Sequence, residues 1–359
     1  MIDTKTAIEK ITNGEFDNLF TDIYIDSSMI DYQKKRYVHA IEQYETIFCP
    51  DKVAIFSAPG RSEVCGNHTD HQHGMVLATS INLDTIAVSA KNNNDVVRFV
   101  SDGYDMITLN INDLEVNDDE AGTTVSLIRG VLRGLKDHGY KIGGFNAYAT
   151  SDVLVGAGLS SSAAFEVVVG TIISGLYNDM KINSVEIAQI SQYAENVFFK
   201  KPCGLMDQMA CSVGGMVNID FKDPTKPIVK KVPTEFEKYD YSLCIVDTKG
   251  DHVDLTDDYA MIPSEMKKVA NFLGEDYLRD CDSNEFYIRL DEIREAVGDR
   301  PVLRAIHFFN EEYNVKNAVS SLENGKFVEF LDAIRKSGNS SFKYLQNVYT
   351  TRDIQHQNI

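Results

Sequence analysis

Three short segments carry side chains that could bind a phosphate, hold a small polar molecule or move a proton. The first, residues 156–164, reads GAGLSSSAA. Glycines let a backbone approach an anion closely, and hydroxyl groups beside the N–H groups of a helix start favour a phosphate site. The spacing matches neither the GxxxxGK[ST] phosphate loop nor the GxGxxG dinucleotide motif. A glycine-rich turn whose serines only cap the next helix explains the pattern equally well.

The second segment, residues 58–70, reads APGRSEVCGNHTD and follows a strand-like run. Arg61, His68 and Asp70 would place several donors and an acceptor in one loop, which suits the hydroxyl groups of a sugar. The stretch HTDHQH that ends this loop also has the density of a zinc or iron site in a hydrolase. The residue types alone leave three interpretations open: a sugar pocket, a metal site and a solvated loop.

The third segment, residues 202–208, reads PCGLMDQ and follows a helical pattern. Asp207 stands beside a methionine and near a cysteine, and a carboxylate in such an apolar setting can have a shifted pKa. It could therefore act as a general base. Taken alone, the segment favours a plainer role for Asp207 as the N-cap of a following helix.

The periodicity of apolar residues predicts the elements that must position these segments. Strands rich in β-branched residues occupy the first third, helices the middle, and a mixed segment follows, which predicts an α+β fold. A composition shift predicts two domains, residues 1–220 and 221–359. The predicted strands are 53–57, 76–90, 96–101, 106–111, 145–150, 215–220, 227–232 and 241–247, and the predicted helices are 123–138, 160–177, 184–199, 257–272, 286–296, 301–313 and 325–337.

In this order the three segments resemble the galactokinase branch of the GHMP kinases. APGRSEVCGNHTD is similar to the galactokinase signature, GAGLSSSAA to the superfamily's phosphate loop, and AENVFFKKPCGLMDQ to the segment that carries the catalytic aspartate. The resemblance implies a two-domain GHMP kinase fold, with an N-terminal domain like domain 2 of ribosomal protein S5 and a ferredoxin-like α/β C-terminal domain. It also implies ATP and Mg²⁺ as cofactors and galactose, or a related sugar, as substrate.

The resemblance assigns a role to each matching position. Asp207 matches the general base, and Arg61 would keep it ionised and stabilise the transferring group. Glu166, four residues after Ser162 on one helical face, competes with Glu195 as a Mg²⁺ ligand by geometry alone. The implied sugar-binding residues are Arg61, Asn67, His68, Asp70, Asp207 and Tyr259; the nucleotide-binding residues are Gly156, Ala157, Gly158, Leu159, Ser160, Ser161 and Ser162; the metal ligands are Ser162 and Glu195.

The sequence departs from the family pattern in three places. The family normally has a glutamate where Asn67 stands, so N-acetylgalactosamine and galacturonic acid remain alternative substrates. His71 and His73 lie where the family usually has a tyrosine and a neighbouring residue of the sugar loop, and they are expected to be incidental. No paired glycines follow Gly215, so the family's last glycine-rich motif is absent from this sequence. We expect either that the chain lacks its natural C-terminus or that this member works without the motif.

The overall charge limits the class of partner. The 359 residues include 35 Lys and Arg against 54 Asp and Glu, a formal charge of −19. Such a chain repels the backbone of a nucleic acid. The sequence shows no signal peptide and no long apolar stretch, which predicts a cytoplasmic protein without a membrane partner. A non-catalytic galactose sensor derived from a kinase is the alternative from another functional class, but the retained Asp207, serine run and Glu195 favour an enzyme.

Overall fold

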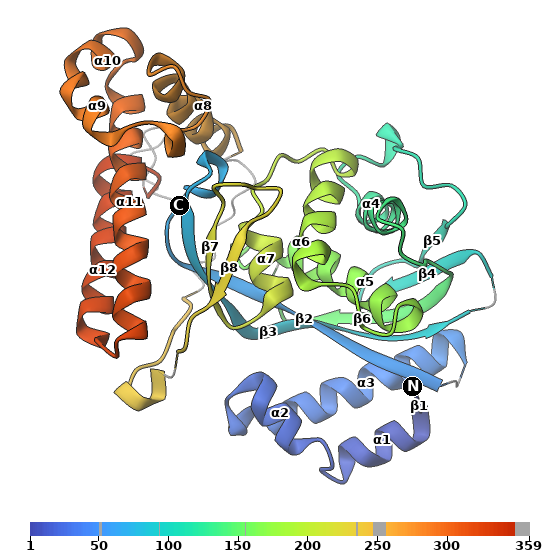
Figure 1. Cartoon of the computed structure of the whole chain (residues 1–359). Helices are drawn as coiled ribbons and strands as arrows, with labels where there is room; N and C mark the ends of the chain where they lie inside the picture. The colour runs from blue at the N-terminus through green and yellow to red at the C-terminus, as the bar shows by residue number, and fades with distance from the viewer. Residues whose placement is uncertain (50–51, 93, 155, 235, 247–255, 349–359) are drawn as a thin grey trace, which may run out of the picture. The chain divides into compact units, whose positions relative to one another are not determined.

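The computed structural model describes residues 1–49, 52–92, 94–154, 156–234, 236–246 and 256–348 (Figure 1). Contacts within the chain define two compact units. Unit 1 comprises Met1–Gly60, Ser80–Val155 and Leu159–Val213, and unit 2 comprises Arg61–Thr79, Gly156–Gly158 and Gly214–Ile359. The division near residue 220 that the composition suggested remains a prediction.

Unit 1 is a mixed sheet with helices on both faces (Figure 1). Its strands follow the order β1-β2-β3-β6-β4-β5. β3 and β6 pair antiparallel from Thr85 opposite Ser151 to Lys91 opposite Phe145, whereas β4 and β6 run parallel. The strands are β1 (Ile2–Asp3), β2 (Lys52–Cys65), β3 (Met75–Lys91), β4 (Val96–Ser101), β5 (Ile107–Asn110) and β6 (Phe145–Ser151).

Successive side chains of a strand point to opposite faces of the sheet, and each face is covered by its own set of helices. Val100 and Tyr148 join the core beneath α1 (Thr4–Thr12), α2 (Asp17–Tyr24) and α3 (Ile30–Phe48). Phe99, which points the other way, meets Phe165 of α5 edge to face. The second face carries α4 (Thr124–Asp137), α5 (Ser161–Tyr177), α6 (Ser184–Tyr193) and α7 (Met206–Val213).

Unit 2 includes the end of β2 and the first residues of β3. The first residues of β3 pair antiparallel with β7 (Met216–Asp220), and β7 pairs with β8 (Ile228–Lys231). Its two apolar cores share α11 (Asp299–Glu323), which packs against α12 (Phe327–Ser340) on one side and α8 (Thr256–Phe272) on the other. Two short helices complete the unit, α9 (Ser283–Ile288) and α10 (Leu290–Val297).

Most predicted elements are present, and the differences have physical reasons. The strand predicted at 241–247 is wrong, because residues 241–246 carry no regular structure; residue 247 lies outside the described residues. The helix predicted at 286–296 is divided at Arg289 into α9 and α10. The helix predicted at 301–313 continues to Glu323, since its apolar face is buried along the whole length. Helices α1–α3 and α7 were not predicted.

A buried ion pair connects the N-terminal helices to the sheet of unit 1. Arg36 of α3 lies 2.6 Å from Asp84 of β3, and both side chains are almost fully buried. The other oxygen of Asp84 accepts hydrogen bonds from the hydroxyls of Tyr24, at 2.9 Å, and Ser57, at 2.5 Å. Every part of this carboxylate is therefore engaged where water cannot replace a lost partner.

Replacing Asp84→Asn should lower the free energy of unfolding by about 3 kcal/mol, because the buried Arg36 charge loses its closer counter-ion and keeps only the more exposed Asp152, 3.1 Å away. Urea denaturation measures the loss. Glu15→Gln, which breaks the exposed pair with Lys10, is the control and should cost about 0–1 kcal/mol. Equal losses in the two variants would show that the buried pair does not hold the N-terminal helices.

Candidate active site

The serine-rich turn lies where the chain enters α5. Gly156, Gly158 and Ser160 all have left-handed backbones, with φ of 77°, 71° and 59°. Within unit 1 the turn passes so close to β2 that a Cβ on Gly60 would lie 2.8 Å from the carbonyl oxygen of Leu159. Ser160 occupies the N-cap position of α5, yet its side chain makes no capping hydrogen bond. The plain explanation of the serines as helix caps therefore fails for Ser160.

The hydroxyl of Ser160 instead donates to Asp207. The distance from Ser160 Oγ to Asp207 Oδ2 is 2.5 Å, and both residues belong to unit 1. Asp207 lies in the first turn of α7 and is half-buried. Asp207 is the second residue of α7, so the start of this helix fixes the position of its carboxylate beside the turn. A candidate base therefore stands beside a candidate phosphate turn.

A second carboxylate, Glu195, lies beside the same helix. It is on a π-helical segment, Ala194–Phe198, that continues α6, and such segments are frequent at functional sites. The side chain is 2 % exposed. Its Oε1 atom accepts from Ser162 Oγ at 3.3 Å, and its Oε2 atom accepts from Gln208 Nε2 at 2.6 Å. The sequence-predicted pair Ser162 and Glu195 is thus in contact.

Lys201 is the cation that neutralises this buried carboxylate. Its ammonium nitrogen lies 2.9 Å from Glu195 Oε1, the oxygen that also faces Ser162. The Lys201 side chain is 58 % exposed, so solvent screens part of the attraction. Lys201 and Gln208 were not among the predicted site residues. Both lie within the segment that resembles the family, but only the folded structure shows that they contact Glu195.

Glu166 is poorly suited to the competing role of metal ligand. It is fully buried, accepts from Gln208 Nε2 at 3.3 Å, and leaves its Oε1 atom without a hydrogen-bond partner in the described part of the chain. Burial, and then the negative charge of Glu195, raise the pKa of Glu166 well above its ordinary value. A carboxyl group whose charged form is disfavoured in this way is a weaker ligand for a hard cation. Glu195, with its hydroxyl partner, is the better candidate.

Arg61 begins the part of the signature that belongs to unit 2. Its Nη1 atom donates to the carbonyl oxygen of Gly158 at 2.6 Å, so the guanidinium holds the glycine side of the serine-rich turn. Arg61 and Gly158 both belong to unit 2, whereas Asp207 belongs to unit 1. The predicted effect of Arg61 on the charge of Asp207 remains a prediction.

The remaining residues predicted to bind the sugar all belong to unit 2. The ring of His68 lies 5.1 Å from that of Tyr259 on α8, centroid to centroid. Asn67 Nδ2 donates to Ser341 Oγ at 3.0 Å, and Asp70 Oδ1 accepts from the backbone N–H of His71 at 2.9 Å. The pairing of His68 with Tyr259 spans 191 positions along the chain, so no local pattern could have revealed it.

The histidine-rich stretch does not form a metal site. Among the described residues no group of three or more His, Cys, Asp or Glu side chains is arranged to hold a metal ion. His73 stacks on Tyr277 with ring centroids 3.6 Å apart. Both ring nitrogens of His71 are shielded from solvent and lack a hydrogen-bond partner within the described ranges. The stretch thus packs as part of the fold.

Burial, and to a smaller extent His307, lower the pKa of His71 to about 4. Between that value and the ordinary 6.5 the unfolded chain binds the proton and the native chain does not. The stability of the protein should therefore fall as the pH drops from 6.5 to 4, by up to about 3 kcal/mol from this residue. Urea titrations of the native protein and of His71→Phe test this. Identical pH dependence in both would contradict it.

Removal of the Lys201 ammonium should destabilise unit 1, because the buried Glu195 loses its counter-ion. We expect Lys201→Met to lower the free energy of unfolding by about 1–2 kcal/mol. Lys200→Met is the matched control, since Lys200 pairs only with an exposed carboxylate, Asp118, at 3.4 Å among its described ion pairs. Denaturation curves that coincide for the two variants would contradict the role of Lys201.

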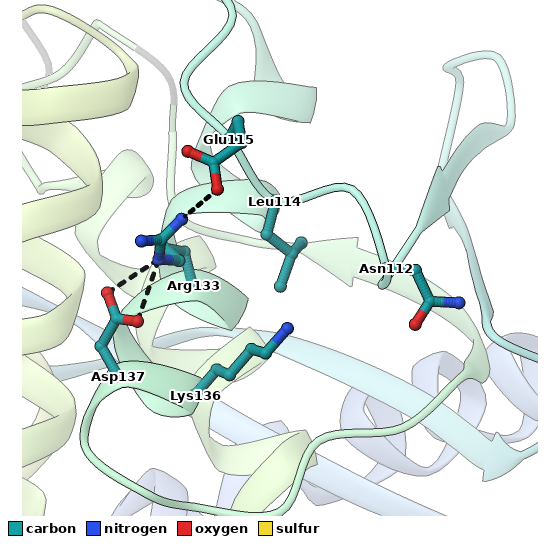
Figure 2. Close-up of a pocket in the computed structure, with 6 residues that line it drawn as sticks. All are labelled: Asn112, Leu114, Glu115, Arg133, Lys136 and Asp137. Carbon is teal, nitrogen blue, oxygen red and sulfur yellow. Dashed lines mark hydrogen bonds and ion pairs between the residues drawn. The ribbon is translucent and has the colours of Figure 1, made fainter.

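A pocket of about 210 Å³ lies in unit 1 away from these motifs, between the segment after β5 and α4 (Figure 2). Arg133 crosses its rim and is paired with Glu115 and Asp137, both at 2.8 Å. The guanidinium is therefore already neutralised. None of the predicted site residues lines this pocket, which is formed by Asn112, Leu114, Glu115, Arg133, Lys136 and Asp137.

Two family models match the segments that carry this chemistry. The GHMP kinase N-terminal domain matches residues 126–215, and the galactokinase galactose-binding signature matches residues 42–91. The chain is therefore similar to the GHMP kinases over one segment and to the galactokinases over another. The first match contains the serine-rich turn, Glu195 and Asp207, and the second contains Arg61 and the sugar-signature loop.

Known relatives agree over most of the chain. The galactokinase of Streptomyces coelicolor is 29% identical over 309 residues, covering 84% of this chain and 77% of the relative. That of Limosilactobacillus reuteri is 29% identical over 316 residues, covering 85% and 79%. The crystal structure of Lactococcus lactis galactokinase in complex with galactose has a TM-score of 0.71 at 22% identity, covering 86% of this chain and 80% of the other. The predicted α+β, two-domain GHMP kinase fold is confirmed. In the described part of the chain no helix is long and apolar enough to cross a membrane.

Proposed function

We propose that this protein transfers the γ-phosphoryl group of ATP to the anomeric hydroxyl of galactose, giving galactose 1-phosphate. The observation that carries the proposal is the hydrogen bond between Ser160 and Asp207, at 2.5 Å, which joins a phosphate-type turn to a carboxylate. Phosphoryl transfer requires in-line positioning and stabilisation of charge more than covalent chemistry from the protein. A base beside the phosphate turn meets that requirement.

The serine-rich turn is proposed to hold the phosphates of ATP. Its left-handed glycines expose backbone N–H groups, and it leads into the N-terminus of α5, where the helix dipole favours negative charge. These local dipoles matter because the chain as a whole carries a formal charge of −19. The residues assigned to the nucleotide are Gly156, Ala157, Gly158, Leu159, Ser160, Ser161 and Ser162.

Ser162 and Glu195 are proposed to hold Mg²⁺. A hydroxyl and a carboxylate are hard oxygen donors, and Mg²⁺ in kinases usually has few protein ligands because waters and phosphate oxygens complete its shell. When bound, the ion would neutralise charge on the phosphate oxygens. Lys201 occupies the same oxygen of Glu195 that faces Ser162, so it would have to move aside for the metal.

The sugar is assigned to Arg61, Asn67, His68, Asp70 and Tyr259, with Asp207 accepting the proton of the anomeric hydroxyl. Galactose is favoured because the galactose-binding signature matches residues 42–91 and the relatives are galactokinases. The comparisons give no support to the two alternative sugars or to the sensor. The negative charge of the chain further favours small-molecule partners over nucleic acid. We place the protein in the cytoplasm, as its N-terminal sequence predicts.

Replacing Asp207→Asn should reduce kcat for galactose phosphorylation by at least about 10²-fold, since the amide cannot accept the proton. Binding of galactose and ATP, measured by calorimetry, should change little because the amide keeps the size and can still hydrogen-bond to Ser160. A variant that retains turnover would remove Asp207 from the role of base. Loss of both turnover and binding would show that Asp207 is structural.

The substrate itself is tested with a panel of aldoses that includes galactose, N-acetylgalactosamine, galacturonic acid and glucose. ADP release is followed with ATP and Mg²⁺ present. We expect the highest kcat/KM with galactose. A preference for another sugar would correct the substrate but keep the kinase, whereas no ADP release with any sugar would contradict the proposed function.

A further inference from the structure

Three neighbouring side chains of α11 bind the backbone of the sugar-signature loop, residues 66–75. His307 Nε2 lies 2.8 Å from the carbonyl oxygen of Asn67. Glu311 Oε2 accepts from the backbone N–H of Gly66 at 2.9 Å, and Glu312 Oε1 accepts from that of Met75 at 2.6 Å. All of these residues belong to unit 2. One helix therefore holds both ends of the loop.

The three side chains are themselves fixed. Glu311 is fully buried and also accepts from Ser337 Oγ at 2.6 Å and from Asn314 Nδ2 at 2.9 Å. Glu312 pairs with Arg279, which also pairs with Asp220 of β7. Hydrogen bonds from α12 and β7 thus set the positions from which α11 reaches the loop.

The proton positions on His307 follow from its partners. A carbonyl oxygen only accepts, so Nε2 must carry the hydrogen that it donates to Asn67. Burial lowers the pKa of His307, and the neutral ring then uses Nδ1 to accept from Ser340 Oγ at 2.9 Å. His307 is therefore a directed donor to one carbonyl group of the loop.

The loop needs such support because its backbone is unusual. Gly66, His68 and His73 have φ of 104°, 58° and 60°. A non-glycine residue in the left-handed region costs on the order of 1–3 kcal/mol and persists only where its surroundings fix it. The ends of the loop also approach α11 closely: a Cβ on Gly66 would lie 3.0 Å from Val315, and one on Gly74 would lie 2.8 Å from Phe308.

We propose that His307 and Glu311 are positioning residues that hold the backbone of Gly66 and Asn67, so that Asn67 and His68 present their side chains to the sugar. The proposal rests on the proposed function of this loop. Neither α11 residue would touch the sugar or the phosphate. Their loss should therefore weaken the binding of galactose and leave the chemical step nearly unchanged.

Four variants separate positioning from general stability. Glu311→Gln puts an amide donor opposite the donors of Gly66 or Asn314, and His307→Leu removes the bond to Asn67. His307→Gln is the conservative variant, because its amide can still donate to that carbonyl. Arg304→Gln is the control: Arg304 lies one turn earlier on α11, is buried, and binds Glu265 and the carbonyl of Leu345.

Three readouts are needed: hydrogen exchange of residues 66–75, steady-state kinetics with galactose and ATP, and the Tm of each variant. Glu311→Gln and His307→Leu should speed exchange in the loop and raise KM for galactose about tenfold or more, with kcat within about threefold and KM for ATP unchanged. His307→Gln should stay near the native values. Arg304→Gln should lower Tm without changing the loop or KM for galactose.

The outcomes are distinct. The same rise in KM and in loop exchange in Arg304→Gln would overturn the proposal, because general loosening would then explain both. No change in Glu311→Gln or His307→Leu would also overturn it. If the native protein does not phosphorylate galactose, the proposed function fails, but hydrogen exchange still decides whether α11 holds the loop.

Discussion

The proposed chemistry depends on one contact, the hydrogen bond from Ser160 Oγ to Asp207 Oδ2. It joins two segments 47 positions apart, the entry to α5 and the first turn of α7. Ser160 has a left-handed backbone and gives up the usual N-cap bond, so its hydroxyl is directed towards the carboxylate and not back into its own helix. Because two helix starts fix the two partners, the turn and the candidate base keep a constant separation. Such rigidity is what an in-line transfer requires.

Two further carboxylates in unit 1 are buried, where a charged carboxylate is energetically unfavourable. Glu166 and Glu195 are both buried, and Gln208 donates to each of them. The arrangement is tolerable because Lys201 neutralises Glu195, and because burial raises the pKa of Glu166 and so favours its neutral form. In a protein with a formal charge of −19, the proposed nucleotide would have to be held by local features, namely the backbone dipoles at the start of α5 and the proposed cation at Glu195.

Local sequence patterns predicted the parts of this structure that local forces determine. The strands β3, β4 and β6 and the helices α4 and α5 follow from alternation and helical periodicity, and the glycines and serines of 156–162 identify the turn. The strand expected at 241–247 was wrong, because a run of β-forming residues needs a partner strand, and residues 241–246 pair with no strand in the described part of the chain. The roles of Lys201, His307 and Glu311 could not be predicted. The partners of His307 and Glu311 lie as far as 245 positions away, for Glu311 and Gly66. Lys201 lies only six positions from Glu195, but no helical or strand spacing brings those two side chains together before the chain folds.

Within unit 1 the contact between Ser160 and Asp207 carries the proposed phosphoryl transfer, and within unit 2 the sugar-signature loop carries the proposed recognition of the sugar. The most direct test is a crystal structure of the protein with galactose, Mg²⁺ and a non-hydrolysable ATP analogue. The account predicts a carboxylate oxygen of Asp207 about 2.6–3.2 Å from the anomeric oxygen, with the nucleotide phosphates on the backbone of residues 156–162. A sugar bound away from Asp207, or phosphates bound away from the serine-rich turn, would contradict it.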